Sequence, residues 1–143
     1  MSGTPNRIVA VPALAEPVGF AHAVVAAQGR TVYLGGQTAQ GRDGAIVGET
    51  MAEQFDVAAG NVVAALRAAG AGPEQLTSLI IYVTDVAAYR AALPELKTVW
   101  RKHFGRHYPA VALLGVAALF DDAAKVELVA TAVIPDEHDV TFR

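Results

Sequence analysis

One apolar run late in the chain constrains the fold more than any other feature. From residue 110 to residue 117 it reads Ala-Val-Ala-Leu-Leu-Gly-Val-Ala, so both alternating sets of positions are apolar. Even the longer stretch 109–120 is too short for a membrane helix, which needs about 20 residues. Residues 79–83, Leu-Ile-Ile-Tyr-Val, repeat the pattern almost fully. Strands with two apolar faces are typical of a sheet that is covered on both sides.

Length and composition indicate one compact domain spanning residues 1–143. Hydrophobic residues make up 53% of the chain and charged residues 17%, which supports a packed core. Residues 1–6 are polar, and we expect them to form a flexible tail. No apolar run follows a basic segment at this end, so we find no secretory signal and expect a soluble, cytoplasmic protein.

Charge and cysteine content exclude several classes of function. The chain has no cysteine, which rules out thiolate catalysis, iron–sulfur clusters and cysteine-based zinc sites. It carries 11 Lys and Arg against 14 Asp and Glu, and no basic cluster stands out. We therefore expect no nucleic-acid partner and no membrane partner.

Apolar periodicity and turn residues predict an α+β order of elements. A helix begins near Thr50 and ends at Gly70, and a second follows the N-cap candidate Asp85 to about Phe104, with Pro94 as an interruption or restart. The turn Gln28-Gly29-Arg30 joins the strands expected at 23–27 and 31–34, which predicts a hairpin. The six predicted strands are 7–11, 23–27, 31–34, 75–84, 110–117 and 125–134.

The proportions of these elements leave one face of the sheet uncovered. Six strands make a sheet about 29 Å wide, whereas two helices packed side by side cover most of one face only. Since the strand pattern requires apolar cover on both faces, we infer that other copies of the same chain supply it in a closed homo-oligomer.

Glu127 is the most informative single residue. It stands within Val126 to Val133, an otherwise apolar strand, and alternation puts it on one face with Val129 and Thr131. A carboxylate buried there needs partners or a raised pKa, which points to a functional role. The alternative is a carboxylate at a strand end that faces water.

Other candidate groups give weaker patterns. His103 and His107 have the i, i+4 spacing of two metal ligands, but no third ligand is evident and a helix end is expected nearby, so we predict no metal site. His22 lines a pocket or lies on a loop. Gly35-Gly36-Gln37 lacks the spacing of a dinucleotide-binding loop, and a bulge accounts for the paired glycines.

An ordered series of motifs resembles the RidA (YjgF/YER057c/UK114) family. The series runs from about Phe20 to Val133 and comprises Thr31-Val32-Tyr33-Leu34-Gly35-Gly36-Gln37, Gln54 with Asn61, Ala68-Ala69-Gly70, Tyr82-Val83-Thr84-Asp85, Pro109-Ala110 and Val126-Glu127. The resemblance implies a chorismate-mutase-like fold, here a mixed six-stranded sheet with two helices on one face, and a homotrimer with ligand clefts between subunits. It also implies hydrolysis of enamines and imines, such as 2-aminoacrylate, without a cofactor.

The chain departs from the family pattern at the expected substrate-binding positions. The family's carboxylate-binding arginine corresponds to Val111, its cleft tyrosine to Phe20 and its helix asparagine to about Leu93. Gly35 replaces a serine before Gly36-Gln37, and His22 completes the expected ligand-binding set. Among the polar site residues only Glu127 is retained, as the candidate catalytic group.

Three functions remain open at this stage. The first is a divergent imine or enamine hydrolase whose substrate is not 2-aminoacrylate, because a bidentate arginine–carboxylate pair contributes about 1.5–3 kcal/mol that this chain lacks. The second is a non-catalytic module that binds a small metabolite or a partner. The third, an endoribonuclease of the L-PSP type, fits the acidic balance poorly.

Overall fold

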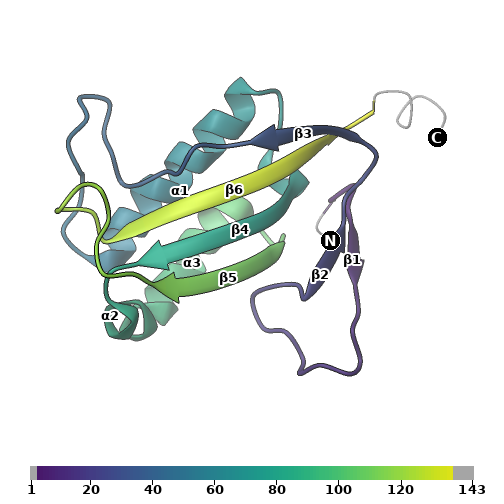
Figure 1. Cartoon of the computed structure of the whole chain (residues 1–143), viewed down its shortest axis with the longest axis horizontal. Coiled ribbons are helices and arrows are strands. Elements are labelled where there is room, and N and C mark those ends of the chain that lie inside the picture. The colour runs from purple at the N-terminus through teal and green to yellow at the C-terminus, as the bar shows by residue number, and fades with distance from the viewer. Residues whose placement is uncertain (1–2, 137–143) are drawn as a thin grey trace.

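A computed structural model describes residues 3–136 of the 143-residue chain. Its elements are β1 (Arg7–Val9), β2 (Ala23–Val25), β3 (Gly29–Tyr33), α1 (Met51–Ala68), the short 3-10 helix η1 (Pro73–Gln75), β4 (Leu76–Val83), α2 (Val86–Ala91), α3 (Leu93–Phe104), β5 (Ala110–Gly115) and β6 (Val126–Pro135). The helices all pack on one side of a twisted sheet (Figure 1). The fold is α+β, as the sequence predicts.

Helix α1 begins and ends where local chemistry requires. The Thr50 side chain accepts a hydrogen bond from the Glu53 backbone amide, and the Glu53 carboxylate accepts one from the Thr50 amide, which completes a capping box. The helix ends before Gly70, whose φ of 90° lies in the left-handed region that favours glycine. Its apolar face, including Phe55, Val62 and Leu66, is buried against the sheet.

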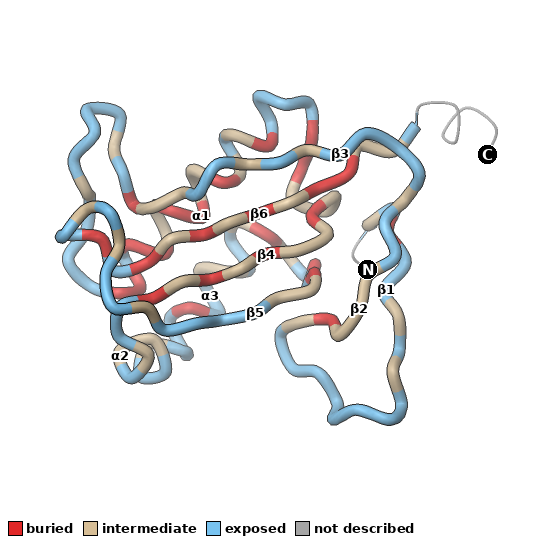
Figure 2. Tube along the Cα trace, viewed as in Figure 1, coloured by how far each residue is buried: buried red, intermediate tan, exposed pale blue. Residues whose placement is uncertain are grey.

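The main sheet has four strands in the order β3-β6-β4-β5. Strand β6 is antiparallel to β3 and β4, whereas β4 and β5 are parallel, so the sheet is mixed. Leu79 and Ile81 of β4 and Leu128 and Ala130 of β6 are buried beneath the helices. Figure 2 shows the resulting alternation of buried and half-buried positions along both strands.

The opposite face of this sheet has no cover within residues 3–136. Ile80 and Tyr82 of β4 and Val129 of β6 lie on it, half-buried. Leu114 of β5 is 45% exposed and Tyr33 of β3 is 81% exposed. We call this surface the bare face. Its apolar character agrees with the expectation that the two helices leave one side open.

The six expected strands are all present, but they form two sheets rather than one. Strands β1 and β2 pair with each other in a separate two-stranded sheet, and the expected hairpin between the second and third strands is wrong. Strand β3 pairs with β6 instead, and Gly29 sits so close to Ile134 that a Cβ at this position would overlap its backbone. The long-range pairing with β6 therefore replaces the local turn pairing.

The interruption expected at Pro94 is present. The second predicted helix is divided into α2 and α3, because Pro94 lies in the first turn of α3 and lacks the amide that would continue α2. Asn6, at the end of the expected flexible tail, is 6% exposed and accepts a hydrogen bond from the Ala27 amide at 2.9 Å. Residues 1–2 of that tail lie outside the described residues.

Candidate functional site

Glu127 is held on the bare face by its neighbours in β6. Val126 and Leu128, on either side of it, are fully buried beneath the helices, so alternation directs Glu127 to the opposite face. The side chain is half-buried, and within residues 3–136 its carboxylate makes no hydrogen bond or ion pair. The carboxylate is therefore available to a ligand or to water.

The backbone at Gly36 lies directly against this carboxylate. A Cβ built on Gly36 would overlap Oε2 of Glu127, so any side chain here would displace the end of Glu127, and the constraint comes from close approach and not from an unusual φ. The pairing of Gln37 with Leu128 sets this position, since each amide donates to the other's carbonyl at 2.8 Å. A Cβ on the preceding residue, Gly35, would meet nothing within 4 Å.

A bulge separates this pairing from the regular ladder of β3 and β6. Leu34 donates to the Ala130 carbonyl, and the next paired residues are Gln37 and Leu128, so Gly35 and Gly36 lie opposite the single residue Val129. The amides of Gly35 and Gly36 have no backbone partner in the described part of the chain. The bulge expected from the paired glycines is present, and the backbone at Gly36 within it lies against Glu127.

Two amide side chains of α1 fasten the segments that carry the site. Gln54, 1% exposed, donates to the carbonyls of Gly48 and Ala123 and accepts from the amide of Lys125 at 2.8 Å. Asn61 donates to the carbonyls of Thr38 and Gln40. These bonds fix the chain just after Gln37 and just before Glu127.

Phe20 and His22, two of the expected ligand-binding residues, lie away from Glu127 in a single chain. The segment around Ala21 pairs with Ala110 at the start of β5, whereas Glu127 is level with Leu114 through Tyr82. The His22 imidazole bonds the Ala15 carbonyl at 2.7 Å, and the Phe20 ring meets it edge-on at 5.1 Å. These residues line a separate pocket at the other end of the sheet.

Val111 and Leu93 also lie apart from Glu127. Val111 is paired with Leu79, which is fully buried, and it packs against the core beneath the helices. It therefore faces the side of the sheet opposite to Glu127. Leu93 is the first residue of α3, in the helical layer, and is 41% exposed. Of the expected site residues, the structure brings only Gly35, Gly36 and Gln37 near Glu127 within one chain. We call these four residues the Glu127 cluster.

The two histidines with ligand-like spacing have unrelated partners. His103 bonds the Asp56 carboxylate at 2.6 Å, between α3 and α1. His107 lies beyond the end of α3 and bonds the Leu76 carbonyl at 2.8 Å. Residues 3–136 contain no group of three His, Asp or Glu side chains arranged to hold a metal ion.

Sequence reasoning missed the residues that surround Glu127. Tyr82 lies directly across from it on β4, and Leu114 lies beyond Tyr82 on β5, so an aromatic ring and then an aliphatic side chain extend the bare face from the carboxylate. Cross-strand register would have been needed to find this pairing, and register depends on long-range contacts.

Comparison with known proteins decides the family. The Endoribonuclease L-PSP family profile matches residues 12–134, most of the chain. The chain belongs to the RidA/YjgF family. No curated protein matches it.

Solved structures of RidA/YjgF proteins share this architecture. A Rid-family protein of unknown function from Yersinia pestis, YyfB, is 29% identical with a TM-score of 0.81, and the match covers 90% of this chain and 98% of that one. A YjgF/YER057c/UK114 member from Mycobacterium tuberculosis is 30% identical with a TM-score of 0.61, over 82% of this chain and 88% of that one. The YjgF gene product of E. coli, 24% identical over 74% of this chain and 82% of its own, shows the same fold with a TM-score of 0.65.

The RidA/YjgF assignment agrees with the scaffold residues. Part of the resemblance rests on scaffold positions of α1. Gln54 and Asn61 hydrogen-bond loops that pack against this helix, and Gly70 ends it. No helix within residues 3–136 has the length and apolar character to cross a bilayer.

Proposed function

We propose that this RidA/YjgF protein is a cofactor-independent imine or enamine hydrolase that acts on an uncharged substrate other than 2-aminoacrylate. One observation carries the proposal: the Glu127 carboxylate is half-buried on an apolar sheet face, against the Gly36 backbone, without an internal partner among residues 3–136. Partial burial of a carboxylate without a partner is costly. These surroundings therefore favour a role in proton transfer over a role in holding the fold together.

In the proposed reaction, Glu127 acts as general base and then as general acid. It takes a proton from water as the water oxygen bonds to the C=N carbon, and it passes that proton to the imine nitrogen to give a carbinolamine. It then takes the hydroxyl proton and passes it to the nitrogen as the C–N bond breaks, which releases ammonia and leaves a carbonyl compound. In this proposal the amides of Gly35 and Gly36, which have no backbone partner within residues 3–136, would donate to the negative charge that develops on the nitrogen.

The surroundings of Glu127 support an uncharged substrate. Tyr82 and Leu114, its neighbours across the strands, carry no positive charge, and Leu114 is 45% exposed. Val111 stands where the family resemblance would expect an arginine, and it packs against the core beneath the helices. Without that pair, we expect kcat/KM for 2-imino acids to be about 10- to 100-fold lower than with it.

The proposed site is completed by assembly. The bare face would be covered by neighbouring copies in a homotrimer, with the Glu127 cluster at the subunit boundary. Tyr33 and Leu114, strongly exposed in the single chain, are apolar surface that such packing would bury. A neighbouring subunit would also supply a second wall for the cleft beside Glu127, which one chain leaves open.

Hydrolysis of benzophenone imine, an uncharged N–H ketimine, tests the mechanism. We expect the wild type to accelerate ketone release and Glu127→Gln to lower kcat/KM by about 100-fold or more, the range for loss of a general acid–base group. The matched control is Glu95→Gln in the exposed first turn of α3, with unchanged rate. Light scattering must show the same mass for all three proteins. Equal rates in Glu127→Gln and the wild type would remove this mechanism.

A non-catalytic binding module is the second candidate. The observation that favours it is that the side chains beyond Glu127 on β4 and β5, Tyr82 and Leu114, carry no charge that could bind and orient an ionic substrate. In that case the wild type would bind small molecules at the bare face but release no carbonyl product from either benzophenone imine or 2-aminoacrylate generated in situ.

A further inference from the structure

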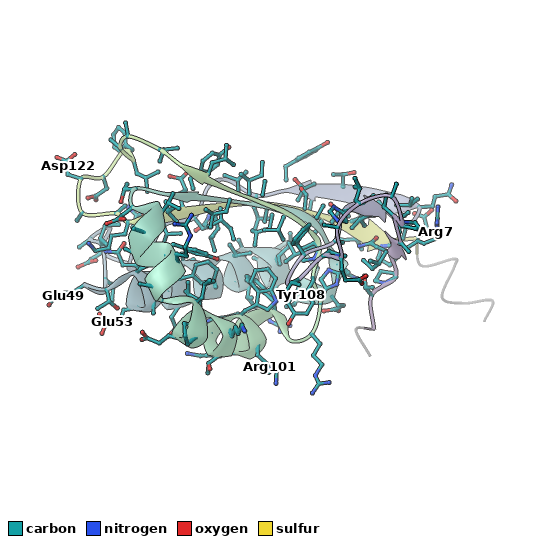
Figure 3. All side chains as sticks on the ribbon, turned by 90° about the horizontal axis from the view of Figure 1, so that it is seen from below. Arg7, Glu49, Glu53, Arg101, Tyr108 and Asp122 are labelled. Carbon is teal, nitrogen blue, oxygen red and sulfur yellow. The ribbon has the colours of Figure 1, made fainter. Side chains whose placement is uncertain are left out.

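A second pocket lies at the opposite end of the sheet from Glu127. It has a volume of about 560 Å³ and opens between the β1–β2 connection and the turn that joins α3 to β5. Tyr108 lines the pocket from the α3–β5 turn and lies between the helical layer and the N-terminal segment (Figure 3). Ile8, Val11, Leu14 and Phe20 supply further apolar surface.

The side chains that line this pocket are held in place by neighbours behind them. The His22 imidazole bonds the Ala15 carbonyl across the loop at 2.7 Å and supports the Phe20 ring. On the other wall, the Tyr108 ring stacks on Trp100 with a centroid distance of 5.7 Å and an interplanar angle of 6°. Such a pocket is formed before a ligand arrives, which lowers the entropic cost of binding.

His107 fixes the back of this pocket. It lines the pocket, and at 2% exposure it is the most buried of the lining residues. Its Nε2 bonds the Leu76 carbonyl, and because a carbonyl only accepts, Nε2 carries the hydrogen. This bond ties the pocket wall to the start of β4.

Two opposite charges also line the pocket. Glu16 comes from the β1–β2 connection and Arg106 from the α3–β5 turn, and both are exposed. Neither forms an ion pair with the other or with any residue in the range 3–136. The pocket therefore offers a carboxylate and a guanidinium separately, together with an apolar wall.

We propose that this pocket binds a free α-amino acid with an apolar side chain. The ligand carboxylate pairs with Arg106, its ammonium pairs with Glu16, and its side chain packs against Leu14, Phe20 and Tyr108. Arg106 offers two parallel N–H donors, which suits a carboxylate.

The site goes beyond the hydrolase proposal and does not depend on it. Ala21 pairs with Ala110 at one end of β5, whereas Glu127 is level with Leu114. Four residues of strand separate these positions, about 13 Å at the usual rise. Binding here therefore needs no contribution from Glu127 of the same chain.

Trp100, the only tryptophan of the chain, provides the readout. Its ring stacks on Tyr108, and its Nε1 donates to the His107 carbonyl, so both of its partners belong to the pocket wall. We expect L-leucine, which does not absorb at the excitation wavelength, to change Trp100 fluorescence in a saturable way. Arg106→Gln should weaken this binding about tenfold or more, the effect of losing a bidentate charged pair.

The controls separate the parts of the proposal. Arg101→Gln, an exposed arginine of α3 that does not line the pocket, should bind L-leucine like the wild type. Glu127→Gln should also bind normally, even if it destroys hydrolysis. The leucine analogue without its amino group, 4-methylpentanoate, should bind at least tenfold more weakly. No saturable change with L-leucine, equal effects of Arg106→Gln and Arg101→Gln, or equal binding of 4-methylpentanoate would overturn the proposal.

Discussion

The contact between Gly36 and Glu127 makes a sharp prediction for single residues. Because the space of a Cβ at residue 36 is occupied by the Glu127 carboxylate, Gly36→Ala must displace that side chain. We expect hydrolysis of benzophenone imine to fall at least tenfold, since small misplacements of reacting groups are costly. Gly35→Ala is the matched control, because its Cβ meets nothing within 4 Å. Equal losses in the two variants would show that the position of Glu127 is unimportant.

At this scale the sequence predicted part of the candidate site. The charge in an apolar strand identified Glu127, and the tandem glycines indicated a bulge, because both are local signals. The side on which Val111 lies was not predictable in this way. Its strand is apolar at both alternating sets of positions, so the pattern carries no face information, and only pairing with buried Leu79 decides it.

Among the elements, α1 depends on Gln54 to hold the loops that flank the site. Its amide makes three hydrogen bonds to backbone groups while 1% exposed. Gln54→Leu leaves those groups without partners, so we expect a loss of about 2–4 kcal/mol in the free energy of unfolding, measured by urea denaturation. Gln40→Leu, exposed and with a single side-chain bond to Gly44, should cost less than about 1 kcal/mol. A loss below 1 kcal/mol in Gln54→Leu would contradict this role.

The contact between α1 and α3 should make stability depend on pH. The hydrogen bond from His103, followed by contacts with Lys102, lowers the pKa of Asp56. A carboxyl whose folded pKa lies below its unfolded value stabilises the fold above the unfolded value, near 4. That contribution disappears as the pH falls through the lowered folded pKa.

Asp56→Asn tests this linkage. At pH 7 it should lower the free energy of unfolding by about 0.5–1 kcal/mol, the range for a partly exposed ion pair. The difference from the wild type should shrink as the pH is lowered below 4. Asp122→Asn, at the tip of the β5–β6 loop (Figure 3), has no such partner within residues 3–136 and should have no effect. A difference that stays constant from pH 7 to pH 3 would speak against the linkage.

The elements themselves were predicted to differing extents. The boundaries of α1 and the start of α2 followed from Thr50, Asp85 and Gly70, because capping is a local interaction. The partner of β3 did not follow, since a turn signal at residues 28–30 suggested a hairpin while the stronger packing with β6 prevailed. Pairing between distant strands depends on the packing of the whole core. A short strand such as β2 has too few residues to show a clear alternation of apolar and polar positions.

For the whole molecule, the bare face predicts assembly. Light scattering should give a mass three times the 14.9 kDa of one chain at micromolar concentration. Val129 lies on this face beside Ile80, and Val129→Arg would place a charge in the proposed interface, so we expect it to shift the protein to smaller species. Lys97→Glu, on the exposed side of α3, changes charge without touching that face and should leave the mass unchanged.

The extent of the bare face also favours assembly. Half-buried Ile80, Tyr82 and Val129 adjoin exposed Leu114 and Tyr33, so the apolar surface is continuous across all four strands. Isolated apolar side chains are common on monomers, but a patch that spans a sheet favours a partner. A wild-type mass of 14.9 kDa under these conditions would leave the apolar pattern of residues 110–117 without its expected cover, and the cleft proposed beside Glu127 would lose its second wall.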